Sequence, residues 1–316
     1  MSLERPFGDR GAFLSERGLR RVNQDAVLMA ELADGAELIA VADGMGGQAA
    51  GEIASRHALD VLHTALRDGA DLPSAIQSAN AAVLSESRGR PEYAGMGTTL
   101  VAVLRRGDSY MVANVGDSRA YRIDAGRIRQ LTRDHSFIAE AGQAGGLSLA
   151  EAERSPWRNA VTRALGTGHE LEVDCFGPHD AREPHTVLLC TDGLHRAVPD
   201  EQLLGMILAA ADPAQAVTAL AQAAHRAGSD DNITLAVVEF GGGAPAVQSP
   251  RAAGGVPRGP AEPTARRAAW RDGPRSPRGD SWKTSLQDWK FTLDYVMFTV
   301  VLILVIYLAV AGLMGP

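Results

Sequence analysis

Short apolar runs alternate with amphipathic segments along the first 240 residues of the chain. Runs of five to nine residues rich in Val, Ile, Leu and Ala predict buried strands. These strands are expected at residues 38–43, 98–104, 109–115, 118–123, 186–192 and 232–240.

Apolar residues spaced three and four apart predict amphipathic helices between these strands. They are expected at residues 52–66, 72–84, 200–210 and 212–228. Asp200 and Asp212 stand at the beginning of the last two segments, so we expect each to cap a helix N-terminus. The first 240 residues therefore hold enough strands and helices for one large domain.

The pattern changes after residue 240. Residues 241–292 begin GGGAPAVQSPRAAGGVPRGP and stay rich in Gly, Pro, Ala and Arg. Such a composition cannot bury enough apolar surface to form a core. We expect a disordered linker over this range.

Residues 295–314 read YVMFTVVLILVIYLAVAGLM and carry no charged side chain. Twenty apolar residues match the thickness of a bilayer core, so a transmembrane helix is expected at 293–314. A buried core helix is the alternative. Nine Lys and Arg residues between Arg251 and Lys290 favour a cytoplasmic location for the preceding domain. A single-pass C-terminal anchor, inserted after translation, is the expected arrangement.

The distribution of charge narrows the class of partner. Residues 1–240 contain 22 arginines, no lysine and 33 acidic residues, which gives a net charge of −11. An acidic domain argues against a nucleic-acid partner and is compatible with bound divalent cations. Two cysteines, Cys175 and Cys190, fit a reducing compartment, and residues 1–11 lack the features of a signal peptide.

Four acids stand where apolar runs end: Asp43, Asp117, Asp192 and Asp231. Each by itself is compatible with an ordinary turn, because Asp-Gly and Asp-Asn pairs are common between elements. The recurrence of the pattern predicts instead that the four carboxylates converge. Carboxylates and backbone carbonyls are hard oxygen ligands that suit Mg²⁺ or Mn²⁺.

Glycines surround the first of these acids in the stretch IAVADGMGGQAAGEI, residues 39–53. Glycine lets the chain turn sharply and leaves space on both sides of Asp43. We expect this arrangement to direct the Gly44 carbonyl at a metal ion.

The chain resembles the metal-dependent serine/threonine protein phosphatases of type 2C, in their bacterial form. The resemblance covers residues 11–240 and rests on eight motifs in the family's order. They are RGLRRVNQDAV, VADGMGGQAAGEIAS, GMGTTLVAVL, VANVGDSRAYRI, LTRDHSF, NAVTRALG, LLCTDGLHRAV and DDNITLAVVEF. The implied fold is α+β, a four-layer αββα sandwich with two central antiparallel sheets flanked by helices, followed here by the transmembrane helix.

The resemblance implies roles for individual residues. Asp43 would bridge two Mn²⁺ or Mg²⁺ ions, with Asp192 and Asp231 completing the first site and the Gly44 carbonyl bound to the second ion. Asp117 would bind a third, weaker metal. Gln24 and Asp25 would lie next to the metal ligands and stabilise the metal sites without being direct ligands. Arg20 would bind the substrate phosphate. If the motif is aligned one residue later, its neighbour Arg21 would take this role.

Three positions depart from the family pattern or affect substrate choice. Gln24 replaces a glutamate, which implies weaker binding of the second metal. Met45 stands where some members have a histidine that acts as an acid. Residues 137–159 correspond to a flap beside the site, with Ser155 at a position often held by histidine.

The expected function is hydrolysis of phosphoserine and phosphothreonine in proteins by a metal-activated water, at the cytoplasmic face of a membrane. Phosphorylated proteins are the expected partners, including those of a bacterial serine/threonine kinase. A catalytically weak scaffold or regulator with the same fold is the first alternative. A membrane receptor or transporter accessory is the second.

Overall fold

The structure is a computed structural model that describes residues 2–47, 49–144, 151 and 154–242. No helix among these residues is long and apolar enough to cross a bilayer. The expected linker at 241–292, apart from its first two residues, and the expected transmembrane helix at 293–314 lie outside the described residues. Both stay predictions.

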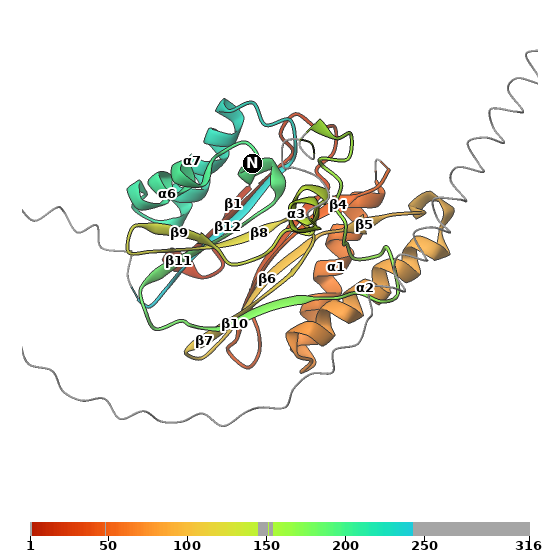
Figure 1. The fold of residues 1–316 in the computed structure, drawn as a ribbon. Coiled ribbons are helices and arrows are strands. Elements are labelled where there is room, and N and C mark those ends of the chain that lie inside the picture. Colours follow the sequence, from red (N-terminus) through yellow and green to blue (C-terminus); the bar gives the residue numbers. More distant parts are fainter. Residues whose placement is uncertain (1, 48, 145–150, 152–153, 243–316) are drawn as a thin grey trace, which may run out of the picture. The chain divides into compact units, whose positions relative to one another are not determined.

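The first sheet joins strands from both ends of the described chain. Its six strands are antiparallel neighbours in the order β1-β2-β12-β11-β8-β9 (Figure 1). Their bounds are β1 (Ser2–Glu4), β2 (Gly11–Glu16), β8 (Arg119–Asp124), β9 (Arg127–Gln130), β11 (His185–Cys190) and β12 (Ile233–Phe240).

The second sheet is antiparallel as well and follows the order β10-β7-β6-β4-β3, with a short strand β5 paired to the end of β4. Its bounds are β3 (Asp25–Glu31), β4 (Glu37–Met45), β5 (Gly97–Thr98), β6 (Leu100–Arg106), β7 (Ser109–Val115) and β10 (Asp174–Asp180).

Helices cover the outer face of each sheet (Figure 1). The long helices α1 and α2 pack on the second sheet, and α6 and α7 pack on the first. The helix bounds are α1 (Ala50–Arg67), α2 (Leu72–Gly89), α3 (Phe137–Ala144), α5 (Asp192–His195), α6 (Asp200–Ala209) and α7 (Pro213–Arg226), with short 3₁₀ turns η1 (Gly8–Arg10) and η2 (Pro91–Tyr93). The described domain is therefore the four-layer αββα sandwich that the resemblance implied.

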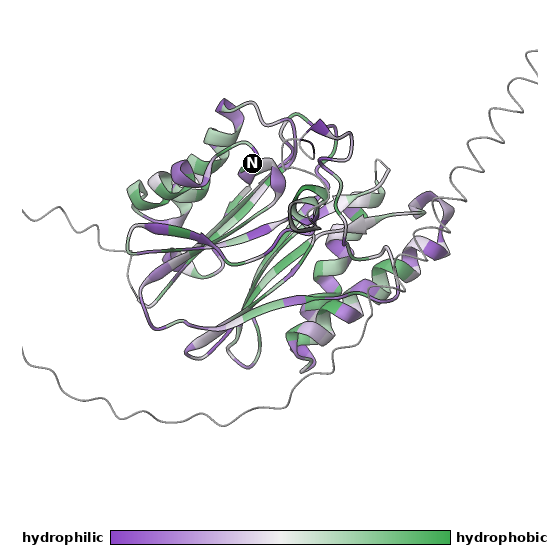
Figure 2. Ribbon diagram, in the orientation of Figure 1, coloured by the Kyte–Doolittle hydropathy of each residue, from purple (hydrophilic) through white to green (hydrophobic). Residues whose placement is uncertain are grey.

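The central strands are apolar on both faces because each face meets a separate core. In β4, Leu38 and Ala40 pack against α1 and α2, whereas Ile39 and Val41 pack between the two sheets. Side chains alternate between the faces of a strand, so a strand buried on both sides becomes a continuous apolar run. Figure 2 shows these hydrophobic residues along the strands of the sheets.

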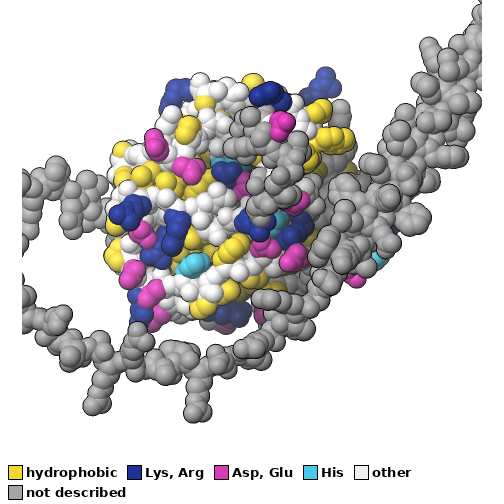
Figure 3. Space-filling view, viewed as in Figure 1, with side chains coloured by type: hydrophobic (Ala, Val, Ile, Leu, Met, Phe, Trp, Pro, Cys, Tyr) yellow, Lys and Arg dark blue, Asp and Glu magenta, His cyan; other side chains and the backbone are white. Residues whose placement is uncertain are grey.

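The outside of the domain is mixed in charge. Arginine and acidic side chains are interspersed on the face that Figure 3 shows. All the basic side chains among the described residues, histidine aside, are arginines, since both lysines of the chain lie beyond residue 242.

Two local expectations need correction. Asp200 is the first residue of α6, and Pro199 occupies the N-cap position; Asp212 does cap α7, where its Oδ1 accepts a hydrogen bond from the Gln215 amide at 2.7 Å. Strand β4 continues past Asp43 to Met45, because Gly44 and Met45 pair with β5.

Candidate active site

Five acids from both sheets lie near one another at one end of the sandwich. Asp25 begins β3, Asp43 lies near the end of β4, and Asp117 occupies the turn between β7 and β8. Asp192 begins α5, two residues after the end of β11, and Asp231 lies two residues before the start of β12. The charges of the other four all act on Asp43. The predicted convergence of Asp43, Asp117, Asp192 and Asp231 is therefore seen in the structure.

Asp25 and Asp43 are direct cross-strand partners in the β3–β4 pair. Asp25 is buried, and its Oδ2 accepts a hydrogen bond from the Thr191 hydroxyl at 2.9 Å. Burial raises the pKa of Asp25 to about 7, with smaller contributions from the charges of Asp192 and Asp231. The carboxylate would be stabilised by a cation nearby.

Asp43 is held through its backbone, and its carboxyl group interacts with that of Asp192. The Thr99 hydroxyl accepts a hydrogen bond from the Asp43 amide at 2.9 Å, and the Thr99 amide donates to the Asp43 carbonyl at 2.9 Å. Burial raises the pKa of Asp43 well above its ordinary value, and the charge of Asp25 adds to the effect. A rigid backbone therefore presents a carboxylate in a strongly negative environment.

Asp192 has one paired and one unpaired oxygen. Its Oδ2 lies 2.7 Å from Arg196 Nη1. Its Oδ1 is buried and receives no hydrogen bond from any residue that the structure describes. Burial raises the pKa of Asp192, and Arg196 opposes this effect. A buried oxygen without a donor is costly, which is the arrangement expected of a metal ligand.

The donor set fits a hard divalent cation. The acids and the Gly44 carbonyl offer oxygen only, as Mg²⁺ and Mn²⁺ prefer. Within the described ranges, no three His, Cys, Asp or Glu side chains enclose an ion by themselves. The roles of single residues as ligands stay predictions.

Two glycines are needed because backbone segments pass very close to them. A Cβ at Gly44 would lie 2.0 Å from the Gly51 carbonyl oxygen, and a Cβ at Gly193 would lie 1.9 Å from the Asn232 carbonyl oxygen. A side chain at either position would force the strands and helices around the acids apart. The glycines therefore permit the compact approach of the elements that carry Asp43, Asp192 and Asp231.

Arg20 lies beside the acids. Its Nη2 lies 2.7 Å from Asp231 Oδ2, and its Nε donates to the Asp230 carbonyl at 3.0 Å. About half of the Arg20 side chain is exposed, so donors can still reach a ligand. Arg20 lines a cavity of about 340 Å³ together with Asp192, Arg196 and Asp231.

Asn232 fixes the loop that carries Arg20. Its Nδ2 donates to the carbonyls of Arg17 and Val22 at 2.8 and 3.0 Å, and its Oδ1 accepts from the Gln24 amide at 2.9 Å. One buried side chain therefore satisfies three backbone groups of the loop between β2 and β3.

The remaining predicted positions surround the acids. The Gln24 side chain donates to the Gly47 carbonyl at 3.3 Å and so contacts the glycine loop after β4. Met45 is partly buried at the end of β4. In the predicted flap, Asn159 lines the cavity, and Ser155 accepts a hydrogen bond from the Trp157 amide at 3.1 Å.

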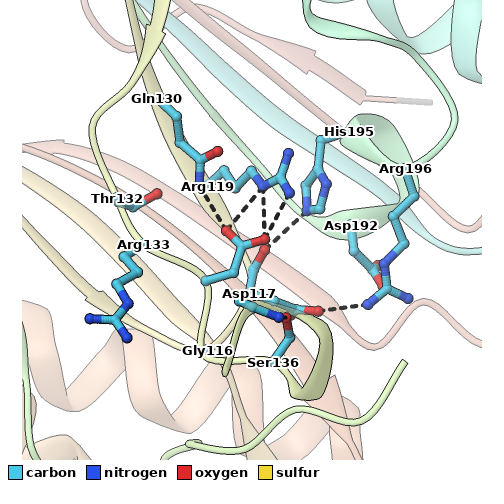
Figure 4. Close-up of polar contacts among 12 residues, drawn as sticks. Gly116, Asp117, Arg119, Gln130, Thr132, Arg133, Ser136, Asp192, His195 and Arg196 are labelled. Carbon is cyan, nitrogen blue, oxygen red and sulfur yellow. Dashed lines mark hydrogen bonds and ion pairs between the residues drawn. The ribbon is translucent and has the colours of Figure 1, made fainter. Parts of the chain in front are cut away.

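Two residues beside the acids were not singled out from the sequence. Arg196 Nη2 lies 2.7 Å from Asp117 Oδ2, and His195 Nε2 donates to the Asp117 backbone carbonyl at 3.0 Å (Figure 4). Asp117 is buried, which raises its pKa to about 6 despite the opposing charge of Arg196. Burial lowers the pKa of His195 well below its ordinary value, which favours the neutral ring. Arg196 lies four residues after Asp192, and this spacing is the signal that could have identified it.

Comparison with known proteins supports one family. Residues 11–233 match the family model described as protein phosphatase 2C. The serine/threonine protein phosphatase PstP of Mycobacterium tuberculosis is 37% identical over 236 residues, which cover 73% of this chain and 45% of PstP. The chain thus spans about half the length of that relative. The serine/threonine phosphatase stp of Listeria monocytogenes is 35% identical over 239 residues, covering 72% of this chain and 94% of stp.

A solved structure agrees with the sequence comparison. The catalytic domain of PstP in complex with two manganese ions superposes with a TM-score of 0.62 at 33% identity, covering 73% of this chain and 98% of that domain. The region matched by the family model contains the whole second sheet and all five acids described above. The chain belongs to the protein phosphatase 2C family.

Proposed function

We propose that residues 1–240 form a metal-dependent phosphatase that hydrolyses phosphoserine and phosphothreonine in proteins. The observation that carries the proposal is the group of buried acids around Asp43, with Asp192 Oδ1 unpaired and Arg20 on the adjoining cavity. Family membership and the two manganese ions in the related PstP structure support it.

Asp43, Asp192, Asp231 and the Gly44 carbonyl would hold two Mn²⁺ or Mg²⁺ ions. When bound, such ions activate water as a nucleophile and stabilise negative charge on the phosphoryl group. Asp25 lies opposite Asp43 on the neighbouring strand, and its charge adds to the negative field that favours the binding of cations. The chain's part is therefore to place oxygen ligands rigidly at one end of the sandwich.

Arg20 would bind the phosphate of the substrate. A guanidinium presents paired donors that match phosphate oxygens. Its contact with Asp231 orients it beside the acids while half of its side chain stays open to the cavity. Phosphorylated proteins, including those of a bacterial serine/threonine kinase, are the proposed substrates.

Phosphate release from a phosphothreonine peptide by the full chain tests the proposal. The chain stripped with EDTA should be inactive, and Mn²⁺ or Mg²⁺ should restore turnover. Turnover that persists after metal removal would contradict the mechanism. A chain that binds Mn²⁺ tightly but never releases phosphate would favour the scaffold or regulator.

We propose further that residues 293–314 anchor the phosphatase in a membrane, with the catalytic domain on the cytoplasmic side. The support is the uncharged stretch 295–314 and the basic residues that precede it. The full chain should stay with membranes during carbonate extraction. Recovery of the full chain in the soluble fraction would contradict the anchor.

A further inference from the structure

One guanidinium joins two buried acids of the candidate site. Arg196 directly follows α5. Its Nη2 lies 2.7 Å from Asp117 Oδ2, and its Nη1 lies 2.7 Å from Asp192 Oδ2. Figure 4 shows Arg196 and His195 approaching Asp117 from α5, with Asp192 beside them. The two carboxylates come from different parts of the chain, so Arg196 ties the turn after β7 to the start of α5.

The carboxylate oxygens of Asp117 and Asp192 differ in their partners. Asp117 is only 3% exposed, and Arg196 supplies the cation for its carboxylate. Asp192 uses Oδ2 for Arg196, and its buried Oδ1 receives no hydrogen bond within the part of the chain that the structure describes. Oδ1 of Asp192 thus remains available to a metal, whereas Oδ2 is already paired with Arg196.

A metal ion placed between Asp117 and Asp192 would have to displace the guanidinium. The planar fork of arginine donates along two directions at once and matches two carboxylates better than a single point charge would. Its charge is permanent, since the pKa of arginine exceeds any working pH. Displacement would also move a cation that is more than half buried and paired twice.

We propose that Arg196 takes the place of a third metal ion between Asp117 and Asp192, so that this phosphatase binds two divalent ions and not three. The proposal rests on the proposed two-metal function of Asp43, Asp192 and Asp231. It replaces the role of Asp117 that the family resemblance implied. In this chain Asp117 is a positioning residue, which fixes Arg196 and through it Asp192.

The number of bound ions tests the proposal directly. The full chain in detergent is stripped of metal and titrated with Mn²⁺, with free Mn²⁺ followed by its electron paramagnetic resonance signal and heats followed by calorimetry. The wild type should bind two ions per chain, with no further uptake at millimolar Mn²⁺. Arg196→Gln should bind a third ion at least tenfold more weakly than the first two. Arg196→Lys, which keeps a positive charge, should bind fewer than three.

Arg182→Gln is the matched control. Arg182 also pairs with an aspartate, Asp180, at 2.6 Å, but both lie on the surface at the end of β10. This variant should bind two ions, as the wild type does.

The outcomes separate the inference from the proposed function. Three ions in the wild type would overturn the role of Arg196, and this result needs no variant to fold. A folded Arg196→Gln chain with only two ions, folding being checked by circular dichroism, would overturn it as well. A wild type that binds no Mn²⁺ tightly would overturn the two-metal function itself and this inference with it.

Discussion

The two ends of strand β4 carry acids in opposite environments. Glu37, at its first residue, is buried between two arginines, with Arg10 Nη2 at 2.6 Å and Arg105 Nη1 at 3.0 Å. Burial raises the pKa of Glu37, but the hydrogen bonds from both arginines outweigh it and the pKa is lowered. Asp43, six residues further along, has acids around it and a raised pKa.

The difference shows how one strand separates stability from function. Glu37 is neutralised by the chain itself, so its ion pairs join β4 to β6 through Arg105 and to η1 through Arg10. Asp43 is left without such a partner, and its repulsion with the neighbouring acids lowers the stability of the metal-free chain. Strain of this kind is typical of catalytic sites, where groups are arranged for a ligand and not for the fold.

Of the substitutions that test this difference between Glu37 and Asp43, Asp43→Asn should have the largest effect on turnover. Removing the charge from the centre of the acid cluster should lower phosphopeptide turnover at least about a thousandfold, because several kcal/mol of stabilisation at the transition state are lost. The melting temperature in EDTA should stay equal or rise, because repulsion falls. Turnover within tenfold of the wild type would show that Asp43 is not central.

Asp117→Asn should have the next largest effect. Without the charge of Asp117, Arg196 keeps only one of its two carboxylate partners and can shift beside Asp192. We therefore expect turnover to fall about ten- to a hundredfold, as for other single electrostatic groups in active sites. The number of tightly bound Mn²⁺ ions should remain two. Loss of a tight ion in this variant would place Asp117 among the tight ligands.

The pH dependence of stability sharpens the same comparison. In the metal-free chain the pKa of Asp25 is raised to about 7 and that of Asp117 to about 6, so the folded state holds more protons than the unfolded state between about pH 4 and pH 7. Stability from these groups is complete at low pH and is lost as the pH rises through 6 to 7.

The melting temperature in EDTA should therefore fall by about 5 °C between pH 5.5 and pH 8, an effect of about 2 kcal/mol for a domain of this size. Saturating Mn²⁺ should remove most of this dependence, because the ions compensate the acids. A metal-free chain that becomes more stable over the same range would contradict the raised pKa values. Glu37 acts in the opposite direction, since its stabilisation is lost only below its unfolded pKa.

Glu37→Gln should have the smallest effect. It leaves two arginines without their acid, and we expect a loss of about 1–2 kcal/mol in the free energy of unfolding. Turnover with saturating Mn²⁺ should be unchanged. Denaturant unfolding measures the loss of stability, and phosphate release on the same preparation measures turnover. A loss of turnover without a loss of stability would contradict the separation of stability from function along β4.

The fold was predictable where strands are buried on both faces. The runs at 38–43 and 232–240 are continuous because each face has its own core, and both became strands β4 and β12. Strand β10, DCFGPHD, was not predicted, because it lies at a sheet edge with few buried residues and reads as a polar loop. The pairing into two sheets came from the family resemblance, since periodicity does not choose strand partners.

The candidate site was predictable in its acids and not in their partners. The sequence pattern places acids at the ends of apolar runs. These acids meet because the strands of both sheets end on the same side of the sandwich. The spacing of Arg196 from Asp192 indicates one of its partners, and only the three-dimensional approach of Asp117 shows the second. Asn232 is similar, because its three hydrogen bonds go to backbone groups more than 200 residues away in the sequence.

Asn232 also affects what substrate binding must supply. Because its amide holds the loop between β2 and β3 at three backbone groups, the conformational entropy of that loop is lost during folding and not again when phosphate arrives. In the proposed function, Arg20 would meet the substrate phosphate as a preorganised group. Little of the free energy of its contacts with phosphate would then be spent on ordering the loop.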